Sequence, residues 1–266
     1  MPDSDSTVLT VEDAGGVRTL TMNRPDTFNS LTLELKHALL AEVQRTAGDE
    51  SVRAVVLTGS GRAFCAGQDL REHAALLDAG DPEPLSTVSE HYNPLISALA
   101  GLPKPTVAAV NGMAAGAGAS LACACDLRVA AASAQFLMAF TKVGLSVDSG
   151  ASWTLPRLVG YGRAMEMLLL AEPVGAEHAL TVGLVNQVIA DEQALGVAQQ
   201  LAGRLAAGPT AAYAKIKEAM AAAATADLPE ALSVEAGTQA EAAATADHRE
   251  GVAAFLAKRD PRFTGR

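Results

Sequence analysis

The feature that most constrains the fold is a stretch of 21 residues without a charge, which lies between Lys104 and Asp126. Its length would allow a membrane span. However, it contains Pro105, Asn111 and three glycines, and its apolar residues are mostly alanines. This pattern favours a buried strand over residues 106–110, a turn and a buried helix over residues 114–124. The stretch therefore predicts an α/β protein rather than one that enters a membrane.

Apolar runs alternate with helical patterns along most of the chain. Residues 52–58 form a continuous apolar run typical of a buried strand, and residues 7–12 and 17–22 alternate as the two arms of a hairpin do. Further strands are expected over residues 126–131 and 184–189. Helices are expected over residues 30–48, 66–79, 86–99, 161–170 and 176–181.

The sequence changes character after Asp191. Alanine-rich helical segments follow one another over residues 192–206, 209–224, 229–244 and 248–258, with no strand pattern among them. We therefore predict an α/β core over residues 1–200 and an α-helical region over residues 201–266. Because these last helices carry few branched or aromatic residues, we expect them to pack on another surface, either the core or a second subunit.

Composition excludes several classes of protein. Hydrophobic residues make up 49% of the chain and charged residues 19%, which argues against disorder. The net charge of −10 and an aromatic content of 4% argue against nucleic-acid binding. Three cysteines and five histidines show no metal-binding spacing, so we expect no metal. The first seven residues do not resemble a signal peptide, and we expect a cytoplasmic protein with reduced cysteines.

Two glycine-containing segments, residues 62–70 and 111–118, each lie where a buried strand gives way to a helix. Free N–H groups at such junctions attract negative charge, and two that converge would form an oxyanion hole. Two alternatives remain open for the second segment. It is part of a dinucleotide-binding fingerprint whose third glycine would be Leu121, or it only allows a helix to pack closely on its neighbour.

A third segment, residues 143–152, places Asp148 between glycines in an otherwise apolar run. Apolar surroundings raise the pKa of a carboxyl group, which suits proton transfer near neutral pH. The alternative is that Asp148 caps the helix that follows.

The whole chain resembles the crotonase (enoyl-CoA hydratase/isomerase) superfamily. The resemblance covers about residues 7–263, and residues 144–150 are most similar to the 1,2-epoxyphenylacetyl-CoA isomerase and Δ3,Δ2-enoyl-CoA isomerase branch. The motifs that carry it occur in order at residues 22–25, 29–31, 63–70, 104–112, 125–128, 155–160, 183–186 and 250–259.

This resemblance implies a spiral of ββα units followed by a helical trimerisation region, assembled as a homotrimer or a dimer of trimers. It implies an acyl-CoA substrate carried as a coenzyme A thioester, with no permanently bound cofactor. The backbone N–H groups of Gln68 and Ala117 would hold the thioester oxygen. Coenzyme A contacts are implied for Arg24, Ala66, Asp69, Leu70 and Lys258, and an acyl pocket for the segment around Leu76 and Leu77.

The departures from the family pattern bear on the reaction. Hydratases of the superfamily carry two glutamates at the places that Ser120 and Phe140 occupy here. Asp148 matches the acidic residue of some isomerases, which implies an acyl-CoA isomerase with one acid–base group. The alternatives are an enoyl-CoA hydratase, an aspartate-nucleophile reaction of the 4-chlorobenzoyl-CoA dehalogenase type, and a coenzyme A-binding protein without catalysis. On the acyl-pocket segment, Glu72, His73, Glu90 and His91 are expected mainly at the solvated surface.

Overall fold

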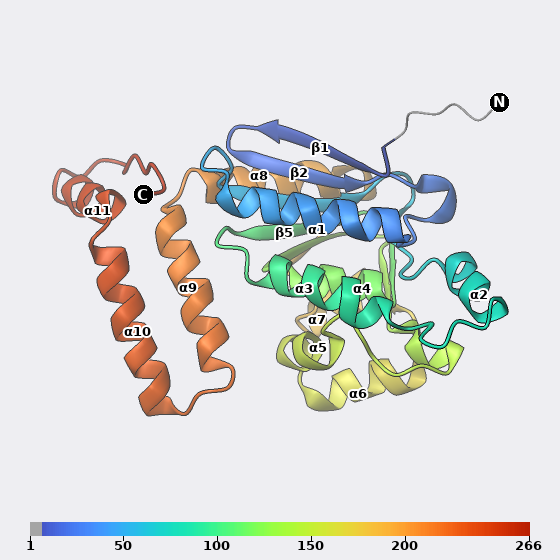
Figure 1. Cartoon of the computed structure of the whole chain (residues 1–266). Coiled ribbons are helices and arrows are strands. Elements are labelled where there is room, and N and C mark those ends of the chain that lie inside the picture. The colour runs from blue at the N-terminus through green and yellow to red at the C-terminus, as the bar shows by residue number, and fades with distance from the viewer. Residues whose placement is uncertain (1–6) are drawn as a thin grey trace.

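A computed structural model describes residues 7–266. Residues 1–6, which belong to the segment that does not resemble a signal peptide, lie outside the described residues. The body is built on two sheets (Figure 1). The larger one has six strands in the order β1-β2-β3-β5-β7-β10: β1 (Leu9–Ala14), β2 (Val17–Met22), β3 (Ala54–Gly59), β5 (Thr106–Val110), β7 (Leu127–Ala131) and β10 (Gln187–Ile189). The hairpin β1–β2 is antiparallel as predicted, and the remaining pairs are parallel.

The smaller sheet was missed by the sequence patterns. Its strands are short: β4 (Ala63–Cys65), β6 (Met113–Ala115), β8 (Gln135–Leu137) and β9 (Val174–Gly175). The chain gives one strand to the large sheet and the next to the small sheet three times in succession. A helix follows each pair, namely α2 (Leu70–Asp78), α4 (Ala117–Ala124) and, after the 3-10 turn η3 (Ala139–Val143), α5 (Ala151–Val159). This ββα spiral confirms the expected fold class.

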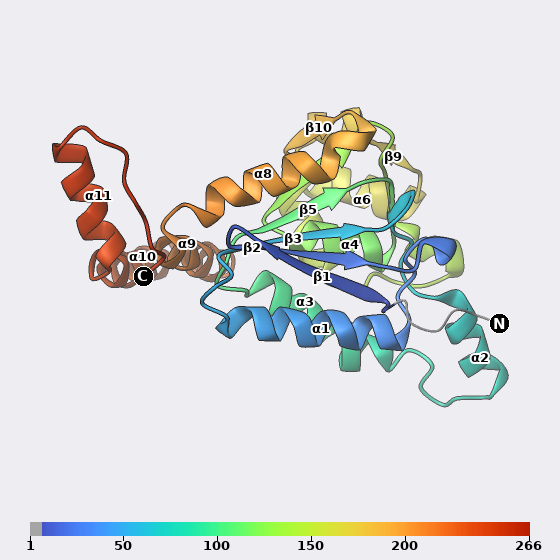
Figure 2. The ribbon, with the colours of Figure 1, turned by 90° about the horizontal axis from the view of Figure 1, so that it is seen from above.

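The two faces of the large sheet pack against different helices (Figure 2). Because side chains alternate along a strand, Ala54 and Val56 of β3 pack against α8 (Ala194–Ala206) on one face. Val55 and Leu57 pack on the opposite face, toward α1 (Leu33–Gly48) and α3 (Asn93–Ala100). The face of α8 toward the sheet is a stripe of fully buried alanines at every fourth position. The boundary expected at residue 200 falls inside α8, which packs on the core along its whole length.

The remaining core helices largely follow the predicted ranges, with differences at their ends. The expected helix 86–99 is a π-helix, η2 (Val88–Tyr92), that continues into α3, and the expected helix 66–79 begins only at Leu70 because Asp69 caps it. The expected strand 184–189 is shorter, since only residues 187–189 pair with β7. The short elements of this part are η1 (Pro25–Thr27), α6 (Tyr161–Leu170), α7 (Ala176–Thr181) and η4 (Asp191–Gln193).

The tail consists of α9 (Thr210–Ala223), α10 (Leu228–Ala243) and α11 (Ala246–Leu256). In both views α9 and α10 lie side by side as a hairpin that stands beside the body (Figures 1 and 2). A capping box formed by Asp227 and Glu230 starts α10. Several large apolar side chains of the hairpin, among them Ile216, Met220 and Leu232, face solvent in the single chain.

The uncharged stretch of the sequence forms β5, β6 and α4, and every residue of α4 is buried. Within residues 7–266, no helix has both the length and the apolar character that crossing a membrane requires.

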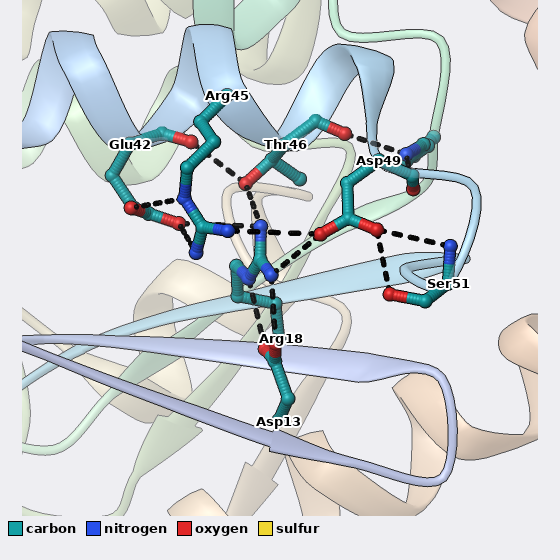
Figure 3. A network of polar contacts seen from close by, with 8 residues as sticks. Asp13, Arg18, Glu42, Arg45, Thr46, Asp49 and Ser51 are labelled. Carbon is teal, nitrogen blue, oxygen red and sulfur yellow. Dashed lines mark hydrogen bonds and ion pairs between the residues drawn. The ribbon is translucent and has the colours of Figure 1, made fainter.

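Arg18 on β2 fastens the β1–β2 hairpin to the end of α1 (Figure 3). Its side chain is 1% exposed, and its guanidinium nitrogens lie 2.7 Å from Asp13 Oδ2, 2.8 Å from Asp49 Oδ2 and 3.2 Å from Glu42 Oε1. The hydrogen bond from Arg18 lowers the pKa of Asp13. Hydrogen bonds from Ser51 and then from Arg18 lower the pKa of Asp49 to about 2. One buried cation thus pairs with three carboxylates, one from β1 and two from the C-terminal part of α1 and its cap.

We expect Arg18→Ala to lower the free energy of unfolding by about 3 kcal/mol, because three converging carboxylates would lose their shared cation. Urea unfolding followed by circular dichroism measures this change. Arg163→Ala is the matched control: it removes an exposed i,i+3 pair with Glu166 and should cost less than about 1 kcal/mol. Equal losses in the two variants would contradict the assigned importance of the Arg18 cluster.

Candidate functional site

A cavity of about 310 Å³ lies between the two glycine segments, α2, η2 and the residues that precede α5. It brings together Gln68, Ala117 and Asp148, three residues that are far apart in the sequence. Its wall is mainly apolar, with leucine, valine and phenylalanine side chains around a few polar groups. The lining residues are Ala66, Gly67, Gln68, Leu70, His73, Leu77, Leu85, Thr87, Val88, Tyr92, Gly116, Ala117, Ala139, Phe140, Val143, Leu145 and Asp148.

The two glycine segments touch through their backbones beside this cavity. Gly67 has a φ of +87°, and a Cβ placed on it would lie 2.7 Å from Ala115 O and 3.3 Å from Ala117 N. A Cβ on Gly118 would lie 2.2 Å from Cys65 O. Side chains are therefore excluded from both positions, and the amides of Gln68 and Ala117 are brought next to each other.

In the part of the chain that the structure describes, neither of these two amides donates a hydrogen bond to another protein group. Ala117 is the first residue of α4, where backbone N–H groups have no partner inside the helix. Gln68 lies between Gly67, whose C=O accepts from Leu31 N, and Asp69, whose N–H donates to Leu31 O. Within residues 7–266, no acceptor takes the N–H of Gln68 or of Ala117. Two unpaired N–H groups that line one cavity form a site for a negatively charged oxygen.

The segment before α1 holds the first glycine segment in place. Ala66 N donates to Phe28 O at 2.9 Å, and Leu31 N donates to Gly67 O at 2.7 Å. Phe28 and Asn29 both have positive φ angles, and the buried Asn29 amide donates to the C=O groups of Ser60 and Ala63. The strained turn is thus tied down by its own side chain.

Arg24 and Asp69 bind each other next to the cavity rather than lining it. Asp69 caps α2 by accepting from Arg71 N and Glu72 N, and it also accepts from Arg24 Nη1 at 3.0 Å and from Ser30 Oγ at 2.8 Å. Burial raises the pKa of Asp69, but the hydrogen bonds from Ser30 and Arg24 outweigh it and lower that pKa overall. These two residues orient α2 and the Gln68 loop.

Asp148 provides the carboxylate of the cavity. Within the described part of the chain, it is the one acidic residue in the cavity wall. Burial raises its pKa, against the effects of a 2.8 Å hydrogen bond from Ser149 Oγ and of the charge on Lys36. The Asp148 side chain does not cap the helix that follows, which was the alternative role. The N-cap of α5 is Gly150, and no side chain makes a capping hydrogen bond there.

Comparison with known proteins agrees with this geometry. The sequence model described as enoyl-CoA hydratase/isomerase matches residues 12–266. A 1,2-epoxyphenylacetyl-CoA isomerase of Escherichia coli is 48% identical over 94% of this chain and 96% of its own. A protein of Rhodobacter capsulatus named a probable enoyl-CoA hydratase is 47% identical over 96% of this chain and 97% of its own. The crystal structure of an enoyl-CoA hydratase from Polaromonas has a TM-score of 0.91, at 36% identity over 96% of this chain and 99% of that one.

The chain belongs to the enoyl-CoA hydratase/isomerase (crotonase) superfamily. It is an enzyme of that family, and the resemblance seen in its sequence motifs is confirmed over nearly the whole chain.

The two positions where hydratases of the superfamily carry glutamates hold no carboxylate here. Ser120 lies in α4, fully buried, with its hydroxyl 3.3 Å from Gly116 O, and it does not line the cavity. Phe140 does line the cavity and makes that part of the wall apolar.

Of the residues expected to contact coenzyme A, the structure places some in the cavity wall and others away from it. Ala66 and Leu70 line the cavity, as do Leu77 and, contrary to expectation, His73. Lys258 directly follows Ala257, the C-cap of α11. Helices α11 and α2 lie at opposite ends of the molecule (Figures 1 and 2). Within one chain, therefore, Lys258 does not reach the cavity.

Sequence reasoning missed two polar residues, Lys36 and Tyr92, that contact the Gln68 side chain. Lys36 Nζ donates to Gln68 Oε1 at 3.2 Å, and Tyr92 OH donates to the same oxygen at 2.5 Å. The sequence pattern could have identified Lys36 as a buried lysine, because it lies on the same apolar face of α1 as Leu39 and Val43. Tyr92 ends the π-helix η2, an element for which sequence periodicity gives no signal.

Gly67→Ala tests the close approach of the two loops. We expect it to lower the free energy of unfolding by about 3 kcal/mol, because a methyl group would meet Ala115 O in addition to the strain of a positive φ. Gly80→Ala is the matched control, since Gly80 also has a positive φ but no atom within 4 Å of an added Cβ. It should cost only about 1 kcal/mol in the same urea titration. Indistinguishable costs would mean that the loops do not approach closely.

Proposed function

We propose that the protein is an acyl-CoA isomerase that moves a proton within a coenzyme A thioester and uses Asp148 as its single acid–base group. The observation that carries this proposal is the pair of unpaired amides, Gln68 and Ala117, in one cavity with one carboxylate. A 1,3-proton shift needs one group that takes a proton and returns it, whereas hydration must also activate water.

In this mechanism the thioester oxygen accepts hydrogen bonds from the Gln68 and Ala117 N–H groups. The Asp148 carboxylate takes a proton from the α-carbon of a 3-enoyl thioester, and the electron pair of that C–H bond passes into a dienolate whose oxygen the amides stabilise. Protonated Asp148 then returns the proton to the γ-carbon, which yields the 2-enoyl thioester and restores the carboxylate. Each oxyanion-hole donor in such sites contributes about 3 kcal/mol to the stabilisation of the transition state.

The environment of Asp148 suits this role. A carboxylate with a raised pKa is a stronger base, and the cavity wall around it is mainly apolar. The active form is the ionised one, so activity should be lost as the pH falls through this raised pKa.

Asp148→Asn should lower kcat for isomerisation of 3-hexenoyl-CoA at least about a hundredfold, since it removes the acid–base group. Affinity for the acyl-CoA should change by less than about threefold, because the two amides remain. The variant should unfold at a temperature no lower than the wild type. The raised pKa means that the folded state disfavours the ionised Asp148 carboxylate at pH 7, and asparagine carries no charge. Asp78→Asn, an exposed change in α2, is the control, and undiminished turnover of Asp148→Asn would overturn the mechanism.

Enoyl-CoA hydration is the second candidate, because a relative with a hydratase name is as similar to this chain as the one with an isomerase name. Crotonyl-CoA, 3-hexenoyl-CoA and a ring-epoxide of an aryl-acetyl-CoA, each followed by mass spectrometry, separate the two. A mass gain of one water would favour hydration, and unchanged mass with a new absorption would favour isomerisation. Binding without turnover of any of the three would favour a coenzyme A-binding protein without catalysis.

We further propose that the chain assembles as a homotrimer or a dimer of trimers, in which the tail helices are covered and Lys258 approaches a neighbouring cavity. The exposed side chains of Ile216 and Met220 on α9 support this, because large apolar side chains grouped on a surface are typical of a protein–protein interface. The double variant Ile216→Glu, Met220→Glu should shift the mass measured by light scattering from three or six chains to one. Val11→Glu, at an exposed apolar residue of the edge strand β1, should leave the mass unchanged. A wild-type chain that is monomeric at micromolar concentration would refute the assembly.

A further inference from the structure

A lysine ammonium is buried in the wall of the site. Lys36, in the first turns of α1, is 3% exposed. Its Nζ donates to Gln68 Oε1 at 3.2 Å and to Thr87 Oγ1 at 2.5 Å, and it lies 4.9 Å from the centre of the Tyr92 ring. All three of these contacts are with uncharged groups.

This arrangement costs stability. Burial lowers the pKa of Lys36, against the more distant charges of Glu72, Asp148 and Asp69. A lysine whose pKa is lowered by folding destabilises the folded state wherever it is charged. Methionine, with a similar length and no charge, would remove that cost. A residue that costs stability at the edge of an active site points to a functional role.

The contacts of Lys36 converge on the side chain whose backbone forms half of the oxyanion hole. Gln68 Oε1 accepts from Lys36 and from Tyr92 OH, and Gln68 Nε2 is 3.3 Å from Asp69 O. The side chain is thus held from α1, from η2 and from the start of α2 at once. These contacts leave the Gln68 peptide group little freedom to rotate.

We propose that Lys36 is a positioning residue of this active site: together with Tyr92 it fixes the Gln68 amide, and its positive charge favours the ionised form of the Asp148 carboxylate. This inference rests on the proposed function for its kinetic consequences, but the positioning of Gln68 is independent of them. Lys36 and Tyr92 act through Gln68 and touch no reacting atom.

The charge of Lys36 acts within a set of neighbouring groups. These are His37 on α1, Asp69, Glu72 and His73 at α2, His91 and Tyr92 on η2, and Asp148 itself. His91 packs on His37 with ring centres 4.9 Å apart, and burial together with the Lys36 charge lowers its pKa. Burial, together with carboxylates such as Asp148, raises the pKa of Tyr92, which therefore stays protonated and donates to Gln68. The charge of Lys36 lowers the pKa of Asp148, so its removal would make Asp148 harder to ionise.

Three variants separate the two effects of Lys36. Lys36→Met removes both the hydrogen bonds and the charge, and kcat for 3-hexenoyl-CoA should fall about tenfold with a smaller change in KM. Lys36→Gln retains a donor without charge, so it should move the acid limb of the pH–kcat profile to higher pH with a smaller loss of the maximal kcat. Tyr92→Phe keeps the charge but removes one hydrogen bond to Gln68, and it should lower kcat without moving the acid limb.

Lys104→Met is the matched control, because Lys104 is also buried but donates to Thr46 O and Asp49 O, away from the cavity. Burial lowers the pKa of Lys104 as it does that of Lys36, so this variant should also unfold at a temperature no lower than the wild type, but it should leave kcat and the pH profile unchanged. Lys36→Met should unfold at a temperature no lower than the wild type. A Lys36→Met enzyme with wild-type kcat and an unmoved acid limb would overturn the inference.

A second measurement distinguishes failure of the inference from failure of the proposed function. Butyryl-CoA labelled with ¹³C at its thioester carbonyl cannot isomerise, and its carbonyl stretch reports the polarisation by the two amides. Infrared spectra should show a lower frequency when it is bound to the wild type than to Lys36→Met or Tyr92→Phe. If the wild type does not turn over 3-hexenoyl-CoA, the proposed function fails, and the inference stands or falls on this frequency. Equal frequencies in all three proteins would overturn it.

Discussion

The site depends on the contact between two backbone loops that only glycine permits. At Gly67 and Gly118 the backbone of another segment of the same chain comes so close that no Cβ fits. The contact brings the amide after Gly67 beside the first amide of α4, and both keep their N–H groups unpaired. An N–H group without a protein partner is available to an oxygen that enters the cavity. The rest of the molecule supplies the rigidity that keeps this arrangement from relaxing.

That rigidity comes from the way the spiral distributes its strands. Each ββα unit leaves one strand in the large sheet and one in the small sheet, so β4 and β6 are paired directly ahead of the two amides. The large sheet is anchored on both faces, by the alanine stripe of α8 on one side and by α1 and α3 on the other. The Arg18 cluster lies at the far end of α1 from Lys36 and fixes that helix to the β1–β2 hairpin. The helix that carries Lys36 is therefore held at both ends.

The sequence allowed much of this architecture to be predicted, but for physical reasons not all of it. Long elements with strong periodicity, such as the hairpin, α1 and the tail helices, follow from their own residues. Strands of two or three residues, such as β6 and β9, do not, because they exist only through pairing with a neighbour. The two glycine segments indicate where backbone amides could converge, because the residue type shows where a side chain is not tolerated, and the family resemblance then implies Gln68 and Ala117. Lys36 and Tyr92 become visible only when α1 and η2 are placed against the Gln68 loop, and the distance of Lys258 from the cavity only when the tail is placed.

The polar groups of the cavity show a common energetic pattern. Burial raises the pKa of Asp148 and lowers that of Lys36, so the folded state disfavours the charged form of each. Each charge partly offsets the cost of the other, but neither forms a direct ion pair that would neutralise its partner. A direct pair would hold the carboxylate of Asp148 away from a substrate. In the proposed function, a carboxylate without an ion pair to this lysine remains available as a base, and the charge of Lys36 favours its ionised form. The sheets and helices around the site supply the stability lost in this way.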